Sequence, residues 1–152
     1  MRPNKQTLAL LPILLLAAAQ GASAQATPEE IVRGELQLFQ GNWTIVSAFM
    51  NGNPDDQRFG TRVAVAGNVL QSSNGPNAGP SARLRLQPTL IPKAIDIIWL
   101  DGPFRGETFY GIYRFDGPRL YVCATRTGVT RPKQFESRPD KVESLVTFER
   151  IP

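Results

Sequence analysis

The sequence predicts an all-β fold, an eight-stranded antiparallel up-and-down barrel preceded by a short helix. Three observations predict it. Eight short β-rich segments follow one another at regular spacing, and turn residues separate almost every pair. No second helix is long enough to cross over between parallel strands. Eight antiparallel strands in sequence order can close on themselves, which removes exposed sheet edges. A β-sandwich built from the same strands is the main alternative.

The chain opens with a pattern typical of a secretory signal peptide. Arg2 and Lys5 precede an apolar run at residues 8–19, and the small residues Ala22, Ser23 and Ala24 follow it. The apolar run is shorter than the roughly 20 residues of a membrane span. We therefore expect cleavage after residue 24 and a protein that is periplasmic or secreted, with an uncleaved N-terminal anchor as the alternative. Residues 25–152 then form a single domain.

Charge and cysteine content exclude some classes of protein. The chain has 17 Lys and Arg against 13 Asp and Glu, and removing residues 1–24 reduces this excess from four to two. No basic run of the kind that binds nucleic acid is present. Cys123 is the single cysteine, so no internal disulfide can form. Its apolar neighbours favour a small buried side chain over a reactive thiol.

The expected helix starts at Thr27, which can cap it, with Pro28 in the first turn and Glu30 completing a capping box. An apolar face recurs through Val32, Leu36 and Phe39, and Gly41 ends the helix. A helix this short needs a surface to lie on. The expected strands are residues 42–50, 61–67, 68–72, 82–87, 94–100, 108–115, 119–125 and 144–150. Residues 73–81, rich in Gly, Pro and Asn, are expected to form a loop.

The start of the first strand resembles a known family. Gly41, Asn42 and Trp43 follow the helix, and this is similar to the G-x-W start of lipocalins and related barrels. The resemblance implies that Trp43 closes one end of the barrel and that an arginine of the last strand, here Arg150, packs across its ring. Such a cation–π contact contributes about 1 kcal/mol when partly desolvated.

A longer stretch resembles an uncharacterised, usually exported bacterial domain family that is expanded in Planctomycetes. The matching segments are "AIDIIWLDGPFRGETFYGIYRFDGPRLYVCA" and "TRPKQFESRP", and the resemblance covers residues 35–151. It implies a lipocalin-like (calycin) fold. It implies no catalytic residue, because the family has no assigned function. The loop at residues 73–81 departs from the family pattern.

Nothing in the sequence indicates an enzyme. The chain has no histidine, which removes the commonest general base and the commonest transition-metal ligand. It has no catalytic Ser-His or Cys-His pair, and no cofactor or metal is expected. Carboxylate-only chemistry or calcium binding would rest on Asp96, Asp101, Glu107 and Asp116. The last three lie at turns, where such residues are ordinary.

Asp96 interrupts an otherwise apolar strand. Ile95, Ile97 and Trp99 share one face of that strand, and Asp96 lies on the other. A buried carboxylate needs a partner. We expect an ion pair on the outer face with an arginine of a neighbouring strand, Arg83, Arg85 or Arg114. The alternative is a polar anchor for a ligand.

Two functions remain. The first is a module that binds a small hydrophobic molecule in the barrel. Its candidate cavity residues are those expected to point inward, together with Asp96: Ile45, Phe49, Asp96, Trp99, Phe109, Tyr113 and Val122. The second is a periplasmic or surface interaction domain with a filled core, whose partner contacts residues 127–140. Large inward aromatic side chains fill a small barrel, which favours a small or absent cavity.

Overall fold

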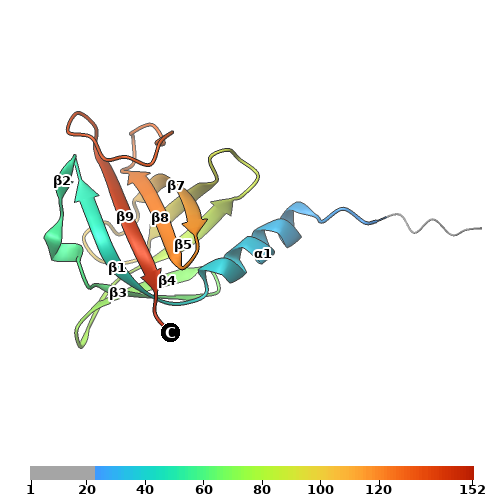
Figure 1. The fold of residues 1–152 in the computed structure, drawn as a ribbon, viewed down its shortest axis with the longest axis horizontal. Coiled ribbons are helices and arrows are strands. Elements are labelled where there is room, and N and C mark those ends of the chain that lie inside the picture. The colour runs from blue at the N-terminus through green and yellow to red at the C-terminus, as the bar shows by residue number, and fades with distance from the viewer. Residues whose placement is uncertain (1–22) are drawn as a thin grey trace, which may run out of the picture.

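The computed structural model describes residues 23–152, which form one helix followed by a closed barrel (Figure 1). The predicted signal peptide lies almost entirely outside the described residues. Within residues 23–152, no helix has the length and apolar character needed to cross a membrane.

The helix α1 (Pro28–Phe39) begins as the sequence predicts. The hydroxyl of Thr27 accepts a hydrogen bond from the backbone of Glu30, and the carboxylate of Glu30 accepts one from the backbone of Thr27. This capping box satisfies two N–H groups that a helix start leaves free. Gln40 caps the other end, and Gly41 follows with a positive φ of 106°, a conformation that glycine adopts without strain.

Eight antiparallel strands then close into the predicted up-and-down barrel. They are β1 (Gly41–Met50), β3 (Arg62–Ala66), β4 (Val69–Asn74), β5 (Asn77–Gln87), β6 (Ala94–Trp99), β7 (Thr108–Asp116), β8 (Arg119–Thr125) and β9 (Glu143–Arg150). Each pairs with its neighbour in sequence order, and β1 also pairs with β9. This last pairing closes the sheet and rules out the sandwich. The two-residue strand β2 (Asn53–Pro54) and the 3₁₀ turn η1 (Asp56–Arg58) fill the connection from β1 to β3.

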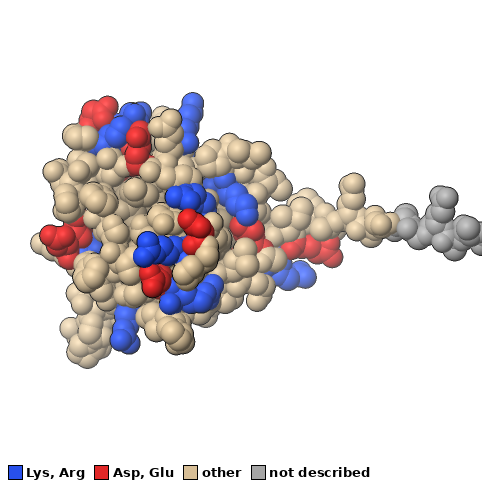
Figure 2. Space-filling model, viewed as in Figure 1, with Lys and Arg blue, Asp and Glu red and all other residues tan. Residues whose placement is uncertain are grey.

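The connections lie at two ends of the barrel. One end, which we call the helix end, carries α1 and the turns β3–β4, β5–β6 and β7–β8; the other, the loop end, carries the long connections at residues 51–61, 100–107 and 126–142. Most of α1 projects away from the barrel at the helix end (Figure 1). Side chains of both charge signs are interspersed over the face shown in Figure 2.

The predicted loop at residues 73–81 is wrong. Strands β4 and β5 run through most of it and leave only Gly75 and Pro76 as the turn. The register shifts between Gln71 and Ser73, where β5 contributes one residue more than β4. Residues 73–81 are mostly exposed. Gly, Pro and Asn are therefore tolerated in this end of the β4–β5 hairpin, although they suggested a loop.

Candidate functional site

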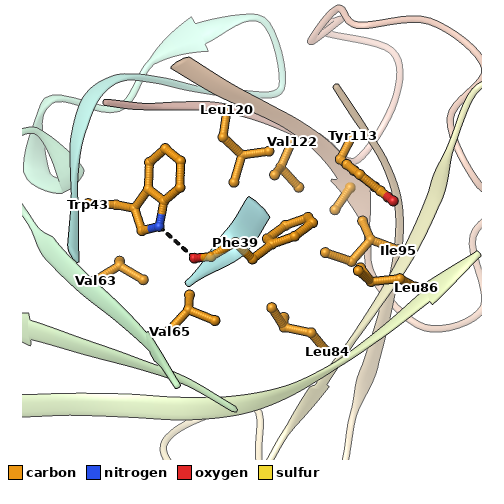
Figure 3. Packing of buried hydrophobic residues seen from close by; sticks show 11 residues of the cluster. Phe39, Trp43, Val63, Val65, Leu84, Leu86, Ile95, Tyr113, Leu120 and Val122 are labelled. Atoms are coloured by element: carbon orange, nitrogen blue, oxygen red, sulfur yellow. Dashed lines mark hydrogen bonds between the residues drawn. The ribbon is translucent and has the colours of Figure 1, made fainter. Parts of the chain in front are cut away.

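The barrel interior is the candidate site, and side chains from every barrel strand contribute to its packing. Figure 3 shows eleven of the side chains that fill it. One buried cluster fills the helix end of the interior and the middle of the barrel. Its members are Phe39, Trp43, Val63, Val65, Leu84, Leu86, Ile95, Tyr113, Leu120, Val122 and Ala124. A smaller cluster of Ile45, Ala48 and Val146 lies further along β1 and β9. All but Phe39 come from strands, at alternate positions as the pleat requires, except that Ile45 and Ala48 are three residues apart across an irregularity in β1.

Phe39, the last residue of α1, enters the barrel and plugs it. Its side chain lies in the middle of the ring of strands in Figure 3 and is 1% exposed. Its ring packs edge-on against Tyr113 and Phe115, with centroids 5.1 and 5.0 Å apart, a favoured geometry for aromatic pairs. The Nε1 of Trp43 donates a hydrogen bond of 2.8 Å to the backbone oxygen of Phe39. The last side chain of the helix therefore enters the end of the barrel, while the neighbouring Leu38 stays at the surface.

Arg150 fastens this plug from the last strand. Its guanidinium carbon lies 4.1 Å from the centroid of the Trp43 ring, the cation–π contact that the lipocalin resemblance implies. The same guanidinium donates hydrogen bonds to the backbone oxygens of Leu38 (2.7 Å) and Gln40 (2.6 Å). The last turn of α1 contains no basic residue, so Arg150 supplies the positive charge that its free carbonyls favour.

Two further polar contacts hold α1 in place. Glu35 accepts hydrogen bonds from the hydroxyl of Tyr113 (3.1 Å) and from Lys93 (2.7 Å). Burial and the nearby carboxylate of Glu35 raise the pKa of Tyr113 well above its usual value, so the hydroxyl stays a donor. Gln40 exchanges two hydrogen bonds of 2.8 Å with the backbone of Gly67. Together with the Trp43 and Arg150 contacts, these hydrogen bonds tie the end of α1 to three strands (β1, β7 and β9) and two turns (β3–β4 and β5–β6) of the barrel.

The space left around the Phe39 side chain is small. The interior cavity measures about 40 Å³ and is lined only by apolar side chains, among them Phe39, Trp43 and Val122. Sites for drug-sized ligands measure roughly 300–1,000 Å³. A lone water would need two or more polar partners, and this lining offers none. The cavity is therefore a packing gap at the tip of the plug.

Aromatic side chains gather at the loop end. Trp99 and Phe109 pack edge-on with centroids 5.8 Å apart, and Phe104 from the connection at residues 100–107 lies 6.1 and 5.1 Å from them. The Nε1 of Trp99 is buried without a hydrogen-bond partner among the described residues. Trp99 and Phe109 thus pack on each other, and Phe109 also packs against the main core cluster, but neither lines the cavity at the helix end.

The other predicted cavity residues divide into two groups. Tyr113, Val122 and Ile45 point into the barrel, where they are buried in its packing. The expectation that Phe49 points inward is wrong. A β-bulge between Ile45 and Ser47 shifts the alternation, so Ala48 takes the inward position and Phe49 is 36% exposed on the outside. A bulge adds one residue to one strand and so reverses the faces beyond it.

Asp96 lies on the outer face and so cannot anchor a ligand inside the barrel. Its side chain is 2% exposed. It accepts hydrogen bonds from Arg85 (2.7 and 2.9 Å) and from Arg131 (2.6 Å). Of the partners expected, Arg85 is present, and Arg83 and Arg114 make no such contact. Arg131, which the sequence reasoning missed, also donates to the backbone oxygens of Ile95 and Gly111.

The Arg131 contacts fasten the connection at residues 126–142 to the barrel wall. Beneath it, Cys123 is fully buried and its thiol donates to the backbone oxygen of Glu136 (3.3 Å). Burial raises the pKa of this thiol to about 11. The hydroxyl of Ser137 donates to the backbone oxygen of Glu143 and accepts from the backbone of Gly52. Much of residues 127–140 therefore serves the fold, and only part of it is free to meet a partner.

The other carboxylates that were candidates for catalysis or calcium binding each contact a hydrogen-bond donor or a cation of a nearby residue. Asp101 accepts hydrogen bonds from the hydroxyl and backbone of Ser81, which lower its pKa. Glu107 pairs with Arg126 at 3.0 Å. Asp116 lies 3.9 Å from Arg114 on the surface. Within residues 23–152, no group of three or more Asp, Glu or Cys side chains is arranged to hold a metal ion.

Comparison with known proteins returned nothing: no family model, curated protein or solved structure matches the chain. The resemblance to the exported bacterial family stays a prediction.

Proposed function

We propose that this protein is an exported, lipocalin-like barrel that acts as an interaction domain through its outer surface, with a core filled by its own side chains. The observation that carries the proposal is the size of the interior cavity, about 40 Å³, against the several hundred Å³ of a ligand site. The plug of α1 occupies the space that a carrier would leave open.

The surface offers apolar side chains that a partner could cover. At the loop end, Phe59 is 69% and Val142 is 47% exposed; in the β5–β6 turn at the other end, Ile91 is 99% exposed. Single exposed apolar residues are ordinary. A filled barrel leaves the surface as the place where binding can happen, and exposed aromatic and aliphatic side chains are what protein interfaces bury.

Export and family membership belong to the same proposal. They are supported by the N-terminal pattern at residues 1–24 and by the matching blocks of the exported bacterial family. The contact between Trp43 and Arg150 is the one that the lipocalin resemblance implies. We place the mature protein in the periplasm or outside the cell, without a catalytic role.

A second candidate function is a carrier of a small hydrophobic molecule. One observation favours it: the cavity lining is wholly apolar, and a single side chain, Phe39, fills the adjoining space. A ligand would have to displace that side chain.

The test is a titration of the purified protein with a panel of apolar ligands, namely fatty acids, retinol and 1-anilinonaphthalene-8-sulfonate. Tryptophan fluorescence reports on Trp43, which lines the cavity. We expect no saturable change, because no ligand of this size fits. Saturable one-to-one binding with a micromolar or lower dissociation constant would contradict the interaction-domain proposal and support the carrier function.

A further inference from the structure

One side of α1 borders an open, mostly apolar groove of about 420 Å³. It is lined by Pro28, Glu29, Val32, Arg33 and Leu36. Pro28, Val32 and Leu36 follow one another at intervals of four residues, so they form one stripe along the helix. The first turns of α1, which bear Pro28 and Val32, project away from the barrel in Figure 1, whereas Leu36 also packs against the barrel core.

One acidic and one basic side chain flank this stripe on the same side. Glu29 and Arg33 each follow a stripe residue by one position and are four residues apart. Both are exposed. Among residues 23–152, neither takes part in an ion pair. Side chains of both charge signs also lie along the projecting helix in Figure 2.

We propose that the groove binds the α1 helix of a second copy of this chain, in an antiparallel pair about a two-fold axis near Ile31. In an antiparallel helix pair, the same flank of each helix meets its counterpart. Glu29 then faces the partner's Arg33, and Arg33 faces the partner's Glu29, so one symmetric contact forms two ion pairs. A two-fold interface requires such self-complementarity, and opposite charges on facing helix flanks set partner and orientation.

The fold leaves room for this pairing. Because α1 projects from one end of the barrel (Figure 1), an antiparallel pair places the two barrels at opposite ends, where they do not collide. The antiparallel arrangement also brings the positive end of one helix dipole towards the negative end of the other. A helix of 12 residues is about 18 Å long. It buries less than the roughly 1,200–2,000 Å² of a stable interface, so the dimer is weak and depends on concentration.

This inference deepens the proposed role as an interaction domain by naming a second copy as one partner. The dimer proposal and the proposed function can fail separately, because sedimentation measures dimerisation and ligand titration measures binding in the cavity.

The experiment is sedimentation equilibrium of the purified protein over concentrations up to about 1 mM, the range in which weak dimers form. The variants Glu29→Arg and Arg33→Glu each turn both reciprocal ion pairs into like-charge contacts. We expect each variant to raise the dimer dissociation constant about tenfold, because two weak surface ion pairs are lost and two repulsive contacts replace them. The double variant E29R/R33E restores complementarity, and we expect it to return to within about threefold of the original. Val32→Glu places a charge in the stripe and should abolish the dimer.

Gln37 provides the matched control, because it is exposed and lies outside the groove. Gln37→Arg and Gln37→Glu bring charges of either sign to α1 and should leave the dissociation constant unchanged. Circular dichroism melts verify that each variant folds. Two results would overturn the proposal: a monomer at every concentration, or a dimer on which the single and double charge reversals have the same effect.

Discussion

Replacing Phe39 with alanine removes the side chain that plugs the barrel while leaving its backbone contact with Trp43 intact, since Trp43 donates to the backbone oxygen of Phe39. The side chain is 1% exposed and contacts two aromatic rings. The substitution deletes about 100 Å³ of side chain, and a residual cavity costs about 24 cal/mol per Å³, so the cavity alone contributes about 2.4 kcal/mol. Lost transfer free energy adds about 2 kcal/mol. We expect a total near 3–5 kcal/mol in the free energy of unfolding.

The cavity that Phe39→Ala would create allows a second prediction. Added to the existing space of about 40 Å³, the deletion gives a dry apolar cavity of about 140 Å³, close to the size that binds benzene. Benzene should therefore stabilise Phe39→Ala, by about 1.4 kcal/mol at ten times its dissociation constant, and leave the original protein unchanged. Both effects are read from urea or thermal unfolding monitored by circular dichroism.

Leu38→Ala is the matched control, because Leu38 is the neighbouring residue of α1 and is 48% exposed. We expect it to cost less than about 1 kcal/mol. The plug would be refuted if Phe39→Ala cost no more than Leu38→Ala. It would equally be refuted if benzene failed to stabilise a folded Phe39→Ala protein.

Three further predictions concern the rest of the barrel. Trp43→Ala should lower the free energy of unfolding by roughly 3–5 kcal/mol, as for a buried large aromatic residue; an unchanged denaturant midpoint would show that Trp43 does not close the barrel. Asp96→Asn should cost about 1–2 kcal/mol, because the buried acceptor loses the charge that strengthens its hydrogen bonds to Arg85 and Arg131, while both arginines keep contact with solvent; urea unfolding against Asp116→Asn, a surface control, checks this. Burial raises the pKa of the Cys123 thiol from 9.0 to about 11. The unfolded thiol ionises first, so stability should fall as pH rises from about 9 to 11, and Cys123→Ala should flatten that part of the unfolding pH profile.

Local signals in the sequence predicted local structure well. The capping box at Thr27 and Glu30 involves residues three positions apart, so the pattern alone determines it. Most of the strands and their antiparallel order followed from turn residues and from the absence of a second helix. The choice between a closed barrel and a sandwich did not, because it depends on the pairing of β1 with β9. Burial of Cys123 followed from its apolar neighbours.

Features that depend on register or on distant contacts were not predictable in the same way. The bulge in β1 has no residue signature, yet it reverses the faces of Ala48 and Phe49. Arg131 comes from a polar connection that looks like any loop, and its partner Asp96 is 35 residues away. No periodicity could pair them.

The position of Phe39 inside the barrel could be predicted only in part. The period of α1 shows that Phe39 belongs to an apolar face, but a period does not say whether that face lies on a barrel or enters it. The contacts that decide the matter reach across the chain, from Arg150 to Leu38 and from Glu35 to Tyr113. A helix followed immediately by Gly-x-Trp, with an arginine in the last strand, is the signal that could have found them.

The central claim is that the barrel is filled by its own side chains. Native mass spectrometry of the protein, purified gently from the compartment in which it accumulates, tests it most directly. We predict the bare polypeptide mass, with residues 1–24 removed, as monomer and weak dimer. A reproducible extra mass of a few hundred daltons per chain, lost on denaturation, would contradict the account, because a barrel holding Phe39 in its interior has no room for that molecule.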